Sequence, residues 1–283
     1  MTTVVFVRRF LTDYARNPVN LVLLAVVPIV FVVVVARTMA DAAFLLGGAG
    51  GPAVETATAG WAAAFLAGIG MYFQTAATRE VDRRVVTAGL PPWRLVAARL
   101  LTGATLAAFA SAVALVALAA RVGVDAPLRV IAGTLMFAII YVSIGAVVGS
   151  VVTSPVNGTV IVLFVWILDV FFGPAMGAAD RLATRGLPTH YVTLWMVDLP
   201  SGHGGRPGDL GWALVWTVAA LDGDRVCDHD RRGCGWGRYE TLAAFGCSLT
   251  DCVLATTAAG VAREVCAASW SASGPEVHNG RWK

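Results

Sequence analysis

The sequence predicts an all-α integral membrane protein, with an N-terminal interfacial amphipathic helix and about six transmembrane helices, the sixth of them truncated. Two observations predict this class. Of the 283 residues, 57% are hydrophobic and 14% are charged, whereas soluble domains carry about 25% charged residues. The apolar residues also fall into long runs, most of about 20 residues, the length that crosses a bilayer. Such a chain is neither disordered nor a soluble enzyme, which could not bury this much apolar surface.

Residues 4–16 precede the first apolar run and have the pattern of a helix lying in the membrane interface. At about 100° per residue, apolar side chains gather on one face and arginines on the other. Such a helix places its apolar face at the acyl boundary. The residues expected there are Phe6, Phe10, Leu11 and Tyr14. Asn17-Pro18 ends the helix, because a proline disfavours helix in the residue before it.

The first transmembrane helix is predicted over residues 19–36, which hold no charge. This run is longer than the apolar core of a cleavable signal peptide, so we expect a span that is not cleaved. Later spans are predicted between arginines, prolines and Gly-rich turns, over residues 58–77, 95–120, 129–152, 155–175 and 210–221.

The arginines predict the orientation. They are dense in the N-terminal segment and in the loop between spans two and three, and sparse for their length in the loops on the other side. The positive-inside rule therefore predicts a cytoplasmic N-terminus.

The loop between spans two and three carries the main functional signal. Residues 79–88 can form a short charged helix, Gly89 can end it, and Pro91-Pro92 can redirect the chain into span three. A rigid, charged corner of this kind suits contact with a cytosolic partner. The alternative is a loop that only determines the topology.

At this loop the chain resembles the permease subunit of type-2 ABC exporters. That family has an interfacial N-terminal helix, six spans, and a second cytosolic loop that opens with Arg-Glu and closes with proline and a basic residue. The matching residues are Arg79, Glu80, Gly89, Pro92 and Arg94. Ala98-Arg99 stands where the family often has Gly-Lys, which keeps the positive charge. The resemblance extends over about residues 1–221.

The resemblance implies a permease of the bacterial cytoplasmic membrane that moves a hydrophobic or amphipathic substrate outward. It implies a second permease chain, in a homodimer or heterodimer, and a separate ATPase subunit that binds ATP. The residues expected to contact that subunit are Arg79, Glu80, Arg83, Arg84, Pro92 and Arg94.

The chain itself has a single lysine, Lys283, and so no lysine for a P-loop. We therefore expect no nucleotide or other cofactor in this chain. No Ser-His-Asp ordering or carboxylate pair stands out and no basic stretch is dense, so we also expect no catalytic residues and no nucleic acid partner. One alternative is an ATP-independent secondary transporter, which would be marked by an internal repeat with broken helices. Another is a membrane enzyme acting on lipid, which would need clustered acidic or histidine residues. Neither pattern is evident in the sequence.

Asp169 lies inside the fifth span and is a functional candidate, because an ionisable group at membrane depth is costly. The equal alternative is that Asp169 reaches the membrane interface or makes a hydrogen bond within the bundle. In the family that the chain resembles, spans two and five line the substrate pathway. This implies a route along Phe65, Tyr72, Phe164 and Trp166. Contact with lipid is the more common reason for aromatic residues at such positions.

Two further patterns are weaker. Gly145 and Gly149 form a GxxxG in span four, where packing within one subunit is expected. His190 and His203 lie in the predicted external segment, but two histidines without a nearby cysteine are a poor metal signal. We predict no metal site there, and an interfacial re-entrant helix over residues 188–199.

The chain is predicted to have two parts, a transmembrane permease domain over residues 1–221 and an atypical polar tail over residues 222–283 that holds all five cysteines. The apolar run 210–221 covers about 18 Å, short of a membrane core of about 30 Å. Three explanations compete. A shifted reading frame or disordered tail fits the sudden change in composition best. The others are a genuine last span over 241–262 and a zinc site at Cys227, His229, Cys234 and Cys247.

Overall fold

The computed structural model describes residues 2–16, 18–46, 48, 51–89, 91–124, 126–152, 154–177, 182–199 and 202–233, with side chains described up to Leu221. Helices and turns, without strands, make up this described part. The chain divides into two units, 1–229 and 230–283. The predicted alternative span 241–262 and the tail cysteine side chains lie outside the described residues.

Helix α1 (Thr2–Ala15) precedes a continuous helical run made of α2 (Pro18–Val30), the π-helical turn η1 (Phe31–Val35) and α3 (Ala36–Leu45). The first span is therefore longer than the predicted 19–36. No glycine or proline occurs between Pro28 and Gly47, and the side chains of Arg37 and Asp41 are exposed on the helix surface. The helix consequently continues past its first charged residue.

Helix α4 (Gly51–Thr87) has 37 residues, which is about 55 Å at 1.5 Å per residue. The prediction of a separate charged helix over 79–88 is wrong, because these residues continue the second span. No glycine or proline interrupts the chain between Gly70 and Gly89. Gly89 has a φ of 97°, which L side chains rarely adopt. As predicted, the helix ends before Gly89, and Pro92 begins α5 (Pro92–Arg121).

The remaining helices are α6 (Pro127–Val151), α7 (Pro155–Phe171), the 3-10 turns η2 (Pro174–Met176) and η3 (Leu182–Gly186), α8 (His190–Met196) and α9 (Pro207–Gly233). Two boundaries differ from the predictions by more than three residues. Helix α7 ends at Phe171 rather than at 175, just before Gly173-Pro174. Helix α9 continues twelve residues past Leu221, although its apolar part ends there.

Four helical segments of the described chain are long and apolar enough to cross a membrane: Val22–Leu45, Gly51–Thr87, Arg94–Arg121 and Pro127–Val151. The apolar helix Pro155–Phe171 is shorter. These helices mark an integral membrane protein. The full number of six spans stays a prediction.

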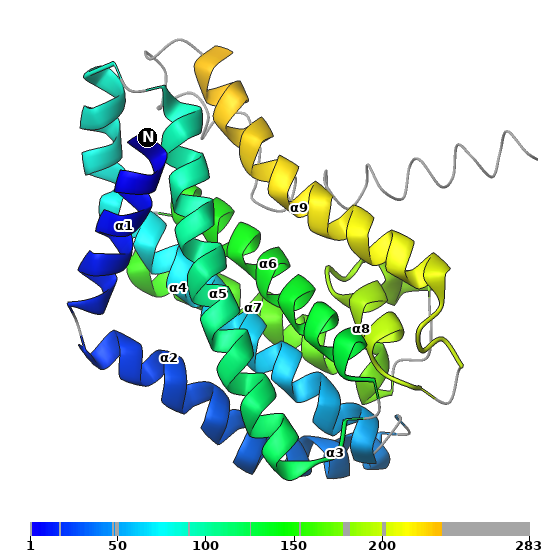
Figure 1. Ribbon diagram of the computed structural model, residues 1–283. Coiled ribbons are helices and arrows are strands. Elements are labelled where there is room, and N and C mark those ends of the chain that lie inside the picture. The colour runs from blue at the N-terminus through cyan, green and yellow to red at the C-terminus, as the bar shows by residue number, and fades with distance from the viewer. Residues whose placement is uncertain are drawn as a thin grey trace, which may run out of the picture. The chain divides into compact units, whose positions relative to one another are not determined.

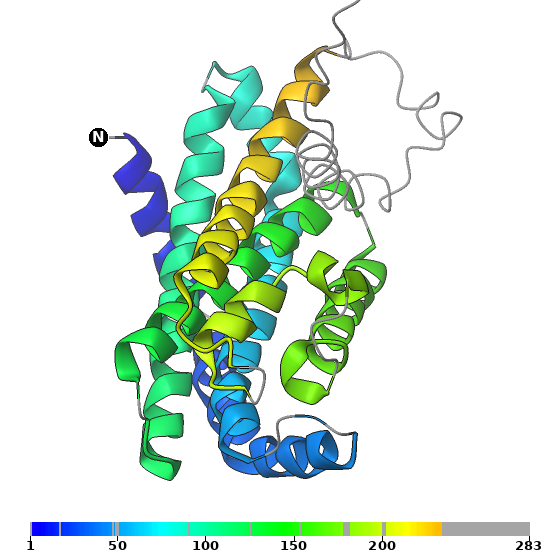
Figure 2. The same cartoon turned by 90° about the vertical axis from the view of Figure 1, so that its right-hand side faces the viewer.

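Helices α4 and α6 come into close backbone contact at two glycines of α6. A Cβ on Gly145 would lie 2.1 Å from the carbonyl oxygen of Gly68, and a Cβ on Gly149 would lie 2.9 Å from that of Tyr72. Only glycine allows this approach, so the GxxxG packs within one subunit as predicted. Figures 1 and 2 show α4, α5 and α6 running alongside one another. The turn between α4 and α5 lies at one end of the bundle, and α3 lies at the opposite end.

Candidate functional site

The corner, residues 79–94, is the place where α4 ends and α5 begins. A buried ion pair braces it: Nη2 of Arg99 donates to Oδ1 of Asp82 at 2.6 Å, and the two side chains are 6% and 21% exposed. The same guanidinium donates from Nη1 to the carbonyl oxygen of Gln74 at 3.2 Å. Its Cζ lies 4.8 Å from the centre of the Phe10 ring. Arg99 therefore holds α5 against α4, with α1 packed over the contact.

Arg79 points away from solvent and is half-buried. Its Nη2 donates to the carbonyl oxygens of Gly149 at 2.6 Å and Val152 at 3.1 Å. The last carbonyls of a helix have no partner within the helix and favour a nearby cation. Arg79 therefore ties the charged end of α4 to the end of α6. It is not as freely available to a partner as the sequence pattern predicts.

The outer side of the corner is exposed. Glu80 and Arg84 form an ion pair at 3.3 Å, with side chains 66% and 78% exposed. Val81 is 58% exposed beside them. Arg94 is half-buried, and its N–H donates to the carbonyl of Pro91. The side chains of Arg83 and Pro92 lie outside the described residues. The corner thus has a polar outer tip and a buried ionic brace.

The aromatic residues predicted to line a pathway do not all come together. Trp166 is buried, with its ring centre 5.1 Å from that of Phe65. Its Nε1 donates to the carbonyl oxygen of Trp61 at 2.9 Å. Tyr72 belongs to a different buried cluster, and its hydroxyl donates to the carbonyl oxygen of Ser154 at 3.0 Å. Phe164 is 59% exposed, as expected for a side chain that faces lipid.

Asp169 lies near the end of α7 and is 3% exposed. Its Oδ2 accepts hydrogen bonds from the Tyr141 hydroxyl at 3.0 Å and from the Thr189 hydroxyl at 2.6 Å. Its Oδ1 accepts from the Thr189 N–H at 3.4 Å. The hydrogen bonds within the bundle that were one interpretation of Asp169 are therefore present, and a role of Asp169 in the substrate pathway stays a prediction. Sequence reasoning missed both partners, because they lie 28 and 20 residues away on other elements.

Comparison with known families shows which family the chain belongs to. The family described as "ABC-2 family transporter protein" matches residues 57–221. The chain belongs to the ABC-2 transporter family. No curated protein and no solved structure matches it. The matched region of this ABC-2 type permease includes the whole corner, its brace and Asp169.

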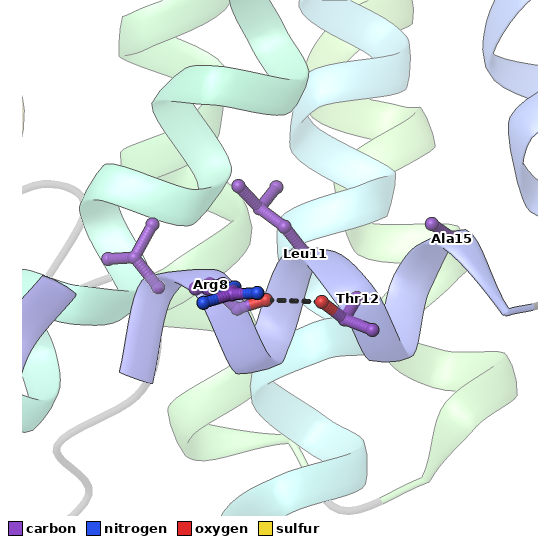
Figure 3. A pocket seen from close by; sticks show the side chains of 5 residues that line it. Arg8, Leu11, Thr12 and Ala15 are labelled. Carbon is purple, nitrogen blue, oxygen red and sulfur yellow. Dashed lines mark hydrogen bonds between the residues drawn. The ribbon is translucent and has the colours of Figure 1, made fainter. Parts of the chain in front are cut away.

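In the permease, α1 packs its apolar side on the bundle. Phe10, Leu11 and Tyr14 are half-buried, and burial raises the pKa of the Tyr14 hydroxyl above its ordinary value. A shallow apolar hollow of about 440 Å³ lies along the helix, and the exposed Arg8 is among the residues that line it (Figure 3). The hydroxyl of Thr12, which also lines it, donates to the Arg8 carbonyl rather than into the hollow. The side chain of Phe6 lies outside the described residues. A position in the membrane interface remains a prediction for α1.

The two histidines of the permease have separate surroundings. Nδ1 of His203 lies 3.0 Å from Oδ2 of Asp209, while His190 is buried and packs edge-on against the ring of Tyr191. Within the described part of the chain, no group of three or more histidine, cysteine or acidic side chains could hold a metal ion.

Proposed function

We propose that this permease is the membrane-spanning subunit of an ATP-driven exporter in the bacterial cytoplasmic membrane. Its N-terminus lies in the cytoplasm, and it acts with a second permease chain and separate ATPase subunits. Membership of the ABC-2 family supports the transport role. The single lysine, Lys283, supports a division of labour in which another chain binds the nucleotide.

The observation that carries the proposal is the two-sided construction of the corner. Glu80 and Arg84 on its outer tip are open to a partner. Beneath them, Arg79 holds the end of α6, and Asp82 with Arg99 holds α5. A buried ion pair is costly to break by loss of one partner. A partner that pushes the tip therefore moves α4, α5 and the end of α6 together instead of bending a loose loop.

The length of α4 supports transmission across the membrane. The helix runs without a break from the corner to Trp61, whose carbonyl accepts the Trp166 hydrogen bond from α7. Displacement of α4 would separate Phe65 from Trp166 and open an apolar route between the two helices. A hydrophobic or amphipathic substrate matches such a lining. Tyr72 and the exposed Phe164 lie away from this contact, and we include them, with Asp169, in the proposed pathway only on the family resemblance.

Charge reversal at the corner tests the proposal. The chain is co-expressed with an ABC-type ATPase subunit that co-purifies with it, the complex is reconstituted, and export of rhodamine 6G is measured together with ATP hydrolysis. R83E/R84E is expected to lower ATP-driven export at least about tenfold while hydrolysis and membrane insertion persist. R37E is the control, because Arg37 is an exposed arginine in α3, at the opposite end of the bundle. Unchanged coupling, or equal losses in both variants, refutes the proposal.

A further inference from the structure

Polar contacts among the described residues help to hold the segment between α7 and α9 against the bundle. Arg129 of α6 forms an ion pair with Asp198, and His203 contacts Asp209 of α9. A further contact joins Asp169 to Thr189. The side chain of Asp198 is 69% exposed, so water screens its ion pair. Asp169 is buried, and its hydrogen bonds act without competition from water.

The carboxyl group of Asp169 joins three elements at one point. It projects from α7 and accepts from the Tyr141 hydroxyl of α6. It also accepts from the hydroxyl and the N–H of Thr189, the residue that precedes α8. Because Thr189 is the N-cap of α8, these bonds place the beginning of that helix. Loss of a buried partner leaves a polar group unsatisfied, which is costly.

Helix α8 packs against α6 and the turns η2 and η3, and its apolar side chains join the buried cluster that contains Trp61 and Trp166. Almost all of its seven residues are buried, Val192 completely. The side chain of Met196 lies so close to α6 that a Cβ on Gly133 would be 2.6 Å from its Cγ. In both views α8 lies in the half of the bundle away from the corner (Figures 1 and 2).

We propose that Asp169 is the positioning residue of a latch, formed with Tyr141 and Thr189, that holds α8 as a plug in the outward end of the transport path. The latch releases α8 when the exporter opens outward. This inference rests on the proposed function, because that function makes the end opposite the corner the outward end. A few hydrogen bonds from side chains are a contact that a moving helix can break and re-form, whereas the glycine-mediated packing of α4 on α6 is not.

The test measures how accessible α8 is from outside. In a variant with the five native cysteines changed to serine, V192C serves as the reporter on spheroplasts treated with a membrane-impermeant maleimide. T189V and Y141F each remove one hydroxyl from the latch and keep the side-chain shape. T193V is the matched control, because it is the same change one turn later, where the hydroxyl donates to the Thr189 carbonyl within the helix.

In spheroplasts depleted of ATP, T189V and Y141F are expected to raise the labelling rate about tenfold each, the factor that corresponds to one hydrogen bond to a carboxyl group. D169N is expected to raise it further, and T193V to leave it unchanged. Equal rates in T189V and T193V overturn the latch.

A second reporter separates latch opening from unfolding. T102C lies at a fully buried site in α5, away from α8, and should stay unlabelled in every variant. Labelling of T102C together with V192C overturns the proposal, since it shows general loosening. The proposed function is tested separately with an unaltered latch. If ATP and the ATPase subunit fail to raise labelling of V192C, the exporter mechanism fails, whereas the comparison without ATP still decides on the latch.

Discussion

The Asp82–Arg99 pair predicts an asymmetric response to mutation. D82N removes the negative charge and leaves a guanidinium that is 6% exposed without its partner. Breaking a buried pair from one side typically costs about 3–5 kcal/mol, and we expect about 3 kcal/mol because Asp82 is 21% exposed. R99M leaves instead a carboxylate that can regain water, so its expected cost is about 1 kcal/mol.

The double variant D82N/R99M shows most clearly whether the two side chains interact. Replacing both charges of a buried pair is often nearly neutral, since no unpaired charge remains. The double variant should therefore be more stable than D82N alone, by about 2 kcal/mol. Free energies of unfolding are measured by denaturant titration in detergent micelles, followed by tryptophan fluorescence. E80Q is the control, because the Glu80–Arg84 pair is exposed and is worth at most about 0.5 kcal/mol.

This reasoning would be refuted if the effects of the two substitutions on the free energy of unfolding were additive. If D82N and R99M cost equal amounts and the double variant loses their sum, the two side chains do not interact energetically. The corner would then be an ordinary helical turn, and the brace could not transmit a push from the ATPase subunit.

The remaining predictions concern packing and the π-helical turn. G145A should lower the free energy of unfolding by about 3 kcal/mol or more and lower the folded yield in detergent, because the added Cβ meets the backbone oxygen of Gly68. G70A, with nothing within 4 Å of the added Cβ, should be neutral or slightly stabilising. R121M removes the donor of the 2.8 Å hydrogen bond to the Val32 carbonyl in η1, so deuterium exchange of residues 31–35 should accelerate about tenfold. Unchanged exchange there would mean that the turn holds without Arg121.

Much of the fold could be predicted from local pattern. Long uncharged runs predicted the membrane helices, and Gly89 and Pro92 predicted the turn into α5, because positive φ and a missing N–H act on the chain at the residue itself. The predicted helix boundaries were wrong where charged residues continue a helix, as at Arg37 and throughout 79–87. Charge alone does not end a helix whose backbone hydrogen bonds remain intact.

The composition and spacing of this chain were enough to place it in a membrane and to single out Asp169 as costly, since both depend on the transfer of side chains from water to lipid. The motif at residues 79–94 was enough to suggest a family. These sequence features could not show that Arg99 meets Asp82, that Arg79 meets the end of α6, or that Asp169 meets Tyr141 and Thr189. Those contacts join residues 17 to 73 positions apart. No helical periodicity links such positions, and only the packing of glycine-bearing helices brings them within bonding distance.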